Sequence, residues 1–151
     1  MIHDSPIWSM ITTEDGEYLF TLDEMDCLKQ ISLKDKAKTK CWRDINENHL
    51  QISQILLTTD CKYLFVSDSI NYTACQYSLK NQKLVHKYDI SGRKCNNKET
   101  GSKFNAHVVM NITKDGKYIW IGNNFGDLLC LSIKRKIVIK CVFGMVNLLN
   151  D

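Results

Sequence analysis

Short apolar runs separated by polar turns cover most of the chain, and no stretch has the periodicity of an amphipathic helix. The runs are rich in branched and aromatic residues, which favours β-strands. In residues 18–20, 63–66 and 118–121, apolar side chains follow one another instead of alternating with polar ones. Strands of that kind are typically buried on both faces. The pattern therefore predicts an all-β protein whose central strands are covered on both sides.

One motif occurs three times, as TEDGEYLF at 13–20, TTDCKYLF at 58–65 and TKDGKYIW at 113–120, so the starts lie 45 and then 55 residues apart. Asp-Gly between apolar runs predicts a β-hairpin, because the turn needs a positive φ that Gly adopts without a Cβ clash. In the middle copy Cys61 stands where the others have Gly. We expect that turn to be strained by about 1–2 kcal/mol or to be of another type.

The motif belongs to a larger repeat of four expected strands. The first unit has strands at 7–13, 18–22, 27–33 and 39–45, the second at 52–58, 62–67, 73–79 and 83–90, and the third at 106–113, 117–121, 127–133 and 136–143. The third strands end alike, in ISL, YSL and LSI. The polar stretch 91–105 predicts an inserted loop, which explains the longer second spacing.

Four strands per repeat, a period near 40–45 residues and the motif T-x-D-G-x-Y-[LI]-[FW] resemble the blades of WD40-type β-propellers. The third strands end in Ile31-Ser32, Tyr77-Ser78 and Leu131-Ser132, where the family usually has Trp-Asp. The family's Gly-His before the first strand is also missing, although His107 stands near that place in the third unit. The resemblance implies one domain over 1–151, with blades at about 6–45, 51–90 and 106–143, the loop at 91–105 and a tail at 144–151.

Three blades are fewer than the roughly four to eight of a closed propeller. The fold class that we predict is therefore an open, partial propeller, with an uncovered apolar sheet face at each end. Large exposed apolar patches usually mark partner surfaces. A second copy, another protein or blades missing from the sequence could complete the ring.

Length and charge are those of an ordinary globular domain, with 151 residues and a net charge of +3. The seven cysteines form no C-x-x-C pair, which favours reduced thiols in a cytoplasmic protein. Neither a signal peptide nor an apolar stretch long enough for a membrane span is visible. The histidines at 3, 49, 86 and 107 lack metal-ligand spacing, so we expect them to be structural. We expect no cofactor and no enzymatic activity, because phosphate-binding, nucleophile-elbow and metalloprotease motifs are absent.

Basic residues gather in the turns between the expected third and fourth strands, which the fold would place on one side of the arc. They are Lys34, Lys36, Lys38, Lys40, Lys80, Lys83, Lys134, Arg135 and Lys136. They could form a basic surface for an acidic protein, nucleic acid or anionic lipid. Equally, they could be solvated lysines that protect edge strands from pairing. No aromatic residues interleave with them, which makes nucleic acid the less favoured ligand.

The inserted loop is a second candidate surface, because loops on a rigid scaffold often carry recognition. Its candidate residues are Arg93, Lys94, Lys98, Lys103 and Phe104. A long polar insertion can also be without a role. Cys95 in this loop is the one thiol that could be reactive, because Arg93 and Lys94 are near it, but a plain surface cysteine is the favoured interpretation. The tryptophans at 8, 42 and 120 lie in strand patterns, so we expect them in the core.

These features predict a non-catalytic scaffold or adaptor that binds other proteins. The alternative is a module that binds an anionic surface or nucleic acid through the basic turns. Salt-dependent binding of a polyanion would distinguish the alternative from the scaffold.

Overall fold

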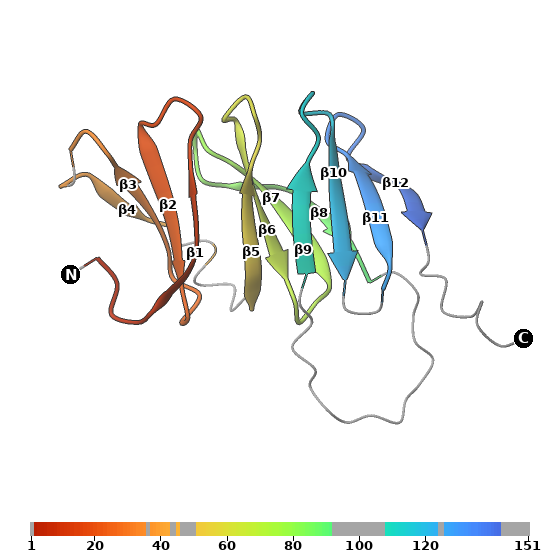
Figure 1. The fold of residues 1–151 in the computed structure, drawn as a ribbon, viewed down its shortest axis with the longest axis horizontal. Coiled ribbons are helices and arrows are strands. Elements are labelled where there is room, and N and C mark those ends of the chain that lie inside the picture. The colour runs from red at the N-terminus through yellow and green to blue at the C-terminus, as the bar shows by residue number, and fades with distance from the viewer. Residues whose placement is uncertain are drawn as a thin grey trace, which may run out of the picture.

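In the computed structural model, which describes residues 2–35, 37–42, 45, 51–91, 108–123 and 126–142, the chain folds into three four-stranded antiparallel sheets. We call them blades 1, 2 and 3, and they stand side by side in an open row (Figure 1). Blade 1 comprises β1 (Ile7–Thr12), β2 (Tyr18–Asp23), β3 (Leu28–Ser32) and β4 (Thr39–Cys41). Blade 2 comprises β5 (Ile52–Leu57), β6 (Tyr63–Asp68), β7 (Thr73–Ser78) and β8 (Leu84–Asp89). Blade 3 comprises β9 (Val108–Ile112), β10 (Tyr118–Asn123), β11 (Leu128–Ser132) and β12 (Ile137–Val142).

Strands follow one another within each sheet in chain order, as the repeat predicted. The fold class is therefore confirmed as an open row of antiparallel blades. Several strands are a residue shorter than predicted at one or both ends, and β4 differs most: it ends at Cys41, although the prediction extended it to Ile45. Most of the predicted loop 91–105, and the tail 144–151, lie outside the described residues.

The repeated motif forms the same hairpin in all three blades. In blade 1 the Thr13 hydroxyl donates to Asp15 Oδ1 at 2.5 Å and accepts the backbone N–H of Tyr18 at 3.0 Å. Asp15 Oδ1 also accepts the N–H of Glu17 at 2.9 Å. The same bonds recur around Thr58 and Thr113. The hydrogen bonds of the turn thus use both threonine and aspartate, which explains why both residues are present in all three repeats of the motif.

Cys61 adopts the left-handed conformation that Gly provides in the other two hairpins. Its φ is 51°, against 67° for both Gly16 and Gly116. Of the two expected outcomes, the structure therefore shows the strained one. Gly116 has a further role, because a Cβ there would collide with the Oγ1 atom of Thr59 in the hairpin of blade 2.

Two apolar cores lie between the blades. We call the face of a blade that points to the next blade its forward face, and the opposite one its rear face. The first core joins Phe20, Leu22, Leu28 and Trp42 on the forward face of blade 1 to Ile55, Leu57, Leu64, Val66, Cys75 and Tyr77 on the rear face of blade 2. The second joins Leu56, Phe65, Ala74 and Tyr88 to Met110, Ile119, Ile121, Leu129 and Leu131 on the rear face of blade 3. Blade 2 is therefore covered on both sides.

Tryptophan placement was predicted correctly only in part. Trp42 is buried and packs edge-on against Phe20 and Tyr77, with ring centroids 5.9 and 6.3 Å away. The expectation that Trp8 lies in the core is wrong, because 53% of it is exposed. The reason is a shift of register between Ile7 and Ser9 on β1, which takes Trp8 out of the alternation of faces.

Helices that are long and apolar enough to cross a membrane do not occur in the described part of the chain.

Candidate interaction surfaces

The forward face of blade 3 carries apolar side chains without a blade to cover them. Phe20, Phe65 and Trp120 are each the third residue of the second strand of their blade. Phe20 and Phe65 are fully buried between blades, whereas Trp120 is only half-buried. Because side chains alternate along a strand, Trp120 points away from the core residues Ile119 and Ile121.

Three exposed aliphatic residues share this face with Trp120. Val109 and Leu128 both pair with Gly122, and Ile137 pairs with Ser132, which itself pairs with Tyr118. Their exposed fractions are 64%, 41% and 48%. We call Val109, Trp120, Leu128 and Ile137 the open face; it lies at the end of the row formed by blade 3 (Figure 1). The expected apolar end is therefore present at blade 3.

At the other end of the row, polar residues replace part of the apolar rear face in blade 1, although Met10, which pairs with Thr21 on this face, is 70% exposed. The cross-strand pair that is Val66 and Cys75 in blade 2, and Ile121 and Leu129 in blade 3, is Thr21 and Lys29 in blade 1. The expected second apolar end face is therefore present only in part, because exposed Met10 lies beside this polar pair.

The N-terminal residues lie on the rear face of blade 1 and bury part of it. His3 bonds through Nδ1 to Asp23 Oδ2 and through Nε2 to Thr21 Oγ1, both at 2.7 Å. The ammonium of Lys29 donates to the backbone carbonyl of Ile2 at 2.6 Å. His3, Thr21 and Asp23 are all buried, although blade 1 is a terminal blade. We call residues 2–6 with these bonds the N-terminal cap.

Asp23 joins the cap to the turn between β2 and β3. Its Oδ1 accepts the N–H groups of Met25 and Cys27 at 3.0 and 2.9 Å. Burial raises the pKa of Asp23, but the N–H of Cys27 and the His3 side chain outweigh it and hold the pKa below its usual value. A neutral His3 that donates from Nδ1 to this carboxylate accepts the hydroxyl of Thr21 at Nε2.

This network was not predicted from the sequence. His3 was expected to be structural, as it is here, but its partners were not identified. No local signal in the sequence indicates this pairing, because the partners of His3 lie 18 and 20 residues away. Ligand atoms of His3, Asp23 and Cys27 also lie within 4.8 Å of one another. In this arrangement the atoms of His3 and Asp23 serve the hydrogen bonds of the cap.

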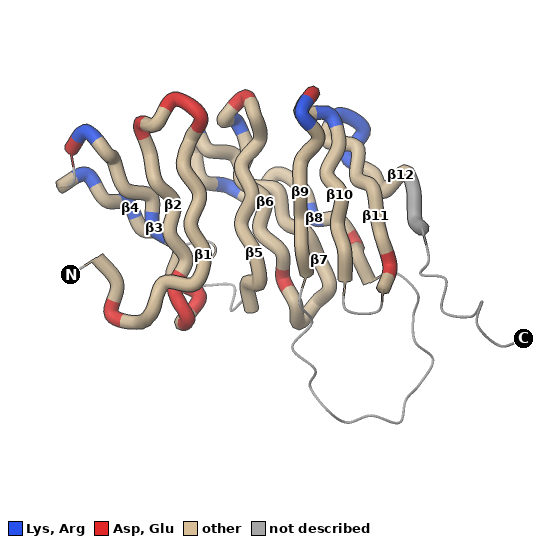
Figure 2. The backbone as a smooth tube through the Cα atoms, viewed as in Figure 1, with Lys and Arg blue, Asp and Glu red and all other residues tan. Residues whose placement is uncertain are grey.

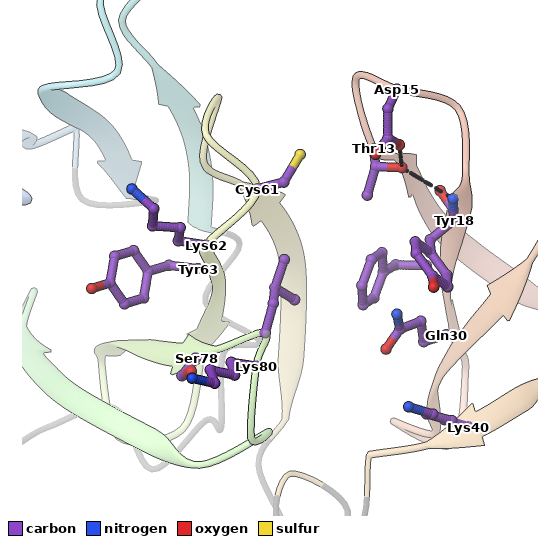
Figure 3. A pocket seen from close by; sticks show the side chains of 12 residues that line it. Thr13, Asp15, Tyr18, Gln30, Lys40, Cys61, Lys62, Tyr63, Ser78 and Lys80 are labelled. Atoms are coloured by element: carbon purple, nitrogen blue, oxygen red, sulfur yellow. Dashed lines mark hydrogen bonds between the residues drawn. The ribbon is translucent and has the colours of Figure 1, made fainter.

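A groove opens between blades 1 and 2, with a volume of about 640 Å³. Figure 3 shows Gln30 and Lys40 of blade 1 pointing toward this space, the Cys61 sulfur directed toward blade 1, and Tyr63 turned away from it. The blade 1 wall therefore presents the Tyr18 ring, the Gln30 amide and the Lys40 ammonium group to this space. The sequence did not predict this groove, because the residues that line it come from two different blades. Its residues are Thr13, Asp15, Tyr18, Phe20, Gln30, Lys40, Cys61, Lys62, Tyr63, Ser78, Leu79 and Lys80.

The basic turns lie on the same edge of the row as the acidic hairpins (Figure 2). Lys34 pairs with Glu17, and Lys38 lies 3.4 Å from Asp35. In the hairpins Lys62 and Lys117 pair with their own aspartates at 3.1 and 3.5 Å. The edge thus has mixed charge, with further exposed cations at Lys40, Lys80, Lys83, Lys114, Lys134, Arg135 and Lys136. Whether these turns bind a partner stays a prediction.

Several predicted residues lie outside the described part of the chain. They are Lys36, Arg93, Lys94, Cys95, Lys98, Lys103 and Phe104.

No family model and no curated protein matches the sequence. Among solved structures, the chain is similar to the WD40 repeats of RRP9 and to U3-55K, in both cases with a TM-score of 0.69 and 12% identity over 96% of this chain and 41% of the other. Hydrazine synthase of Kuenenia stuttgartiensis gives a TM-score of 0.65 and 12% identity over 95% of this chain and 37% of the other. The chain thus spans about two fifths of the length of these structures. Together with the three antiparallel sheets, the likeness shows that the fold is that of WD40-type propeller blades, in an open row of three.

Proposed function

We propose that the chain is a non-catalytic scaffold that binds other proteins. The observation that carries this proposal is the open face of blade 3, where Val109, Leu128 and Ile137 are each more than two fifths exposed. The equivalent faces of blades 1 and 2 are buried against a neighbour. Exposed apolar side chains on one face of a rigid sheet favour association with another protein.

The similar structures support this kind of function without deciding it. Two of them are WD40 structures, a fold that generally serves as a scaffold, whereas the third is named as an enzyme. Function depends on the site and not on the fold. The five cysteines whose side chains the structure describes form no disulfide, which fits the cytoplasm, the compartment that we include in the proposal.

Binding of an anionic surface through the basic turns is less favoured. Lys34 and Lys38 already have carboxylate partners, and the neighbouring hairpins add further carboxylates to the same edge. A mixed-charge edge attracts a polyanion less than a uniformly basic one does.

Photo-crosslinking in cells tests the scaffold proposal. A photoreactive amino acid is placed at Val109 on the open face, and in a matched variant at Met25, which is 77% exposed on a turn of blade 1. We expect a discrete crosslinked protein from position 109 that position 25 does not give. The same crosslinks from both positions, or none from position 109, would contradict the proposal.

A further inference from the structure

The groove between blades 1 and 2 contains a glutamine whose counterpart in blade 2 is buried and hydrogen-bonded. Gln76 of β7 is buried, and its side-chain oxygen accepts the hydroxyl of Tyr88 at 3.0 Å. Gln30 has the same place in β3, since each glutamine pairs with the phenylalanine of the neighbouring strand. Blade 1 has Trp42 in the place of Tyr88, and the Trp42 ring packs in the first core. Gln30 is only half-buried, and its amide has no hydrogen-bond partner within the described ranges.

Two further residues of blade 1 are open to the groove although their counterparts in blade 2 pack against neighbours. Tyr18 and Tyr63 each begin the second strand of their blade. Tyr63 packs against the second core, whereas Tyr18 is 37% exposed and lines the groove. Lys40 pairs with Gln30 as His86 pairs with Gln76, and only His86 contacts a neighbouring ring. The groove therefore depends on residues that blade 1 does not share with blade 2.

Two unpaired cations lie at one end of this groove. Lys40 on edge strand β4 and Lys80 in the turn after β7 belong to opposite walls, and both are exposed. Neither forms an ion pair within the described ranges, whereas Lys62 is held by its own Asp60 at 3.1 Å. The carboxylate of Asp15 lies at the other end of the blade 1 wall, at the β1–β2 hairpin (Figure 3). The end formed by the third and fourth strands is therefore positive.

We propose that this groove binds a short extended segment of a partner protein that carries an acidic side chain. The acidic side chain lies between Lys40 and Lys80, where two ammonium groups are available to one carboxylate. The Gln30 amide offers both a donor and an acceptor to a backbone peptide group of the segment. Tyr18 and Leu79 supply apolar surface on the two walls. The groove is a second binding surface, separate from the open face, so that either can exist without the other.

The size of the groove favours a peptide segment over an extended polyanion. Its volume of about 640 Å³ lies within the range of about 300–1,000 Å³ that is typical of small-ligand sites, which suits a few residues of extended chain. A membrane surface or a nucleic-acid backbone would instead need a broad basic surface. The hairpins place carboxylates along the same edge of the row (Figure 2), which weakens attraction of that kind.

Selection from a library of random peptides displayed on phage tests this proposal without a known partner. The unchanged chain is one target, and the double variant Lys40→Glu with Lys80→Glu is the other. We expect Asp and Glu to be enriched among peptides that bind the unchanged chain, and Lys and Arg among those that bind the double variant. Selected peptides without an acidic bias, or no selected peptides at all, would overturn the proposal.

Fluorescence anisotropy of a selected acidic peptide then measures each contact. The double variant should weaken binding by about tenfold or more, because both charge-assisted contacts become repulsive. The matched control is Lys134→Glu with Lys136→Glu, which changes the net charge equally at exposed positions in blade 3. It should leave the affinity nearly unchanged. Equal loss in both double variants would show that net charge alone attracts the peptide, which would overturn the groove as its site.

Gln30→Leu tests the wall of the groove at constant charge. It should weaken the same peptide, because the amide that pairs with the peptide backbone is gone. An unchanged affinity would show that the lysines act without the groove and would overturn the proposal. Urea unfolding checks that each variant is folded, as we expect for changes at exposed or half-buried side chains.

Val109→Lys separates this site from the open face. Val109 is 64% exposed on blade 3, and the variant should bind the selected peptide as the unchanged chain does. Loss of binding would place the peptide on the open face and overturn the groove as its site. A failed peptide selection together with a discrete crosslinked protein from position 109 would reject the groove and keep the scaffold proposal.

Discussion

Position 116 requires glycine for two physical reasons. Its φ of 67° is costly for any residue with a side chain, and the Thr59 side chain of the neighbouring blade occupies the space of a Cβ. Gly16 has the same φ, but a Cβ there would meet nothing within 4 Å. A substitution at Gly16 therefore tests backbone strain alone, whereas a substitution at Gly116 tests backbone strain together with the contact between blades.

We expect Gly16→Ala to lower the free energy of unfolding by about 1–2 kcal/mol, the cost of a left-handed residue. Gly116→Ala should lower it further, because Thr59 must also move. Urea unfolding of both variants measures the difference.

The contact with Thr59 can be isolated by a double-mutant cycle. Adding Thr59→Ala should return Gly116→Ala to the level of Gly16→Ala, since the colliding Oγ1 is gone. Equal stability of Gly16→Ala and Gly116→Ala would mean that the hairpins of blades 2 and 3 do not make this contact.

At the scale of single elements, the same motif gives three strands with different surroundings. β6 is almost fully buried, as its consecutive apolar residues predicted, whereas β10 alternates between buried and half-buried positions. β2 is buried from Phe20 onward, partly through the N-terminal cap. Strand identity was predictable because turn chemistry and β-propensity are local. Burial was not, because it depends on which blade or segment covers each face.

Cys61 and His3 show where sequence reasoning ends. The turn at Cys61 keeps its geometry because Thr58, Asp60 and Tyr63 fix the hairpin around it. The sequence predicted either a strained residue or another turn type at Cys61, and it could not decide between them. His3 finds partners 18 and 20 residues away. That pairing requires the register of β1 and β2, and no local signal encodes it.

The hairpins should make the chain sensitive to acid. The hydroxyl of Thr13 and the N–H of Glu17 hold the pKa of Asp15 below its ordinary value, and Asp115 is lowered in the same way by Thr113 and Lys117. Because the folded state favours the carboxylate, this stabilisation is present above pH 4 and is lost as the pH falls through the lowered pKa. Thr13→Val should return the pKa of Asp15 toward its ordinary value, which carbon NMR titration of the carboxyl groups measures.

Thr12→Val is the matched control, since Thr12 is the exposed neighbour of Thr13. It should leave the titration of Asp15 unchanged. Thr13→Val should also destabilise the hairpin by about 1 kcal/mol, because the N–H of Tyr18 loses its acceptor. Equal titration curves in both variants would show that the hydroxyl does not set the pKa.

At the scale of the whole molecule, the two cores make blade 2 the centre of stability. Its rear face packs on blade 1 and its forward face on blade 3, whereas each outer blade shares one core only. The sequence predicted this row of blades from its repeats. It did not predict the N-terminal cap on blade 1, because the cap depends on a few polar residues whose bonds form only after folding.

Hydrogen exchange should reveal this hierarchy. Amides open through local unfolding, and the free energy of opening is highest where most apolar area is buried. We expect the slowest exchange in β6 and β7, faster exchange in β10 and β11, and the fastest in the short edge strand β4. Ile119→Ala, which leaves a cavity in the second core and costs about 2–5 kcal/mol, should speed exchange in blade 3 while β2 and β3 stay protected. Mass spectrometry of peptic fragments measures each strand, and a uniform rate in all three blades would mean that the row unfolds as one unit.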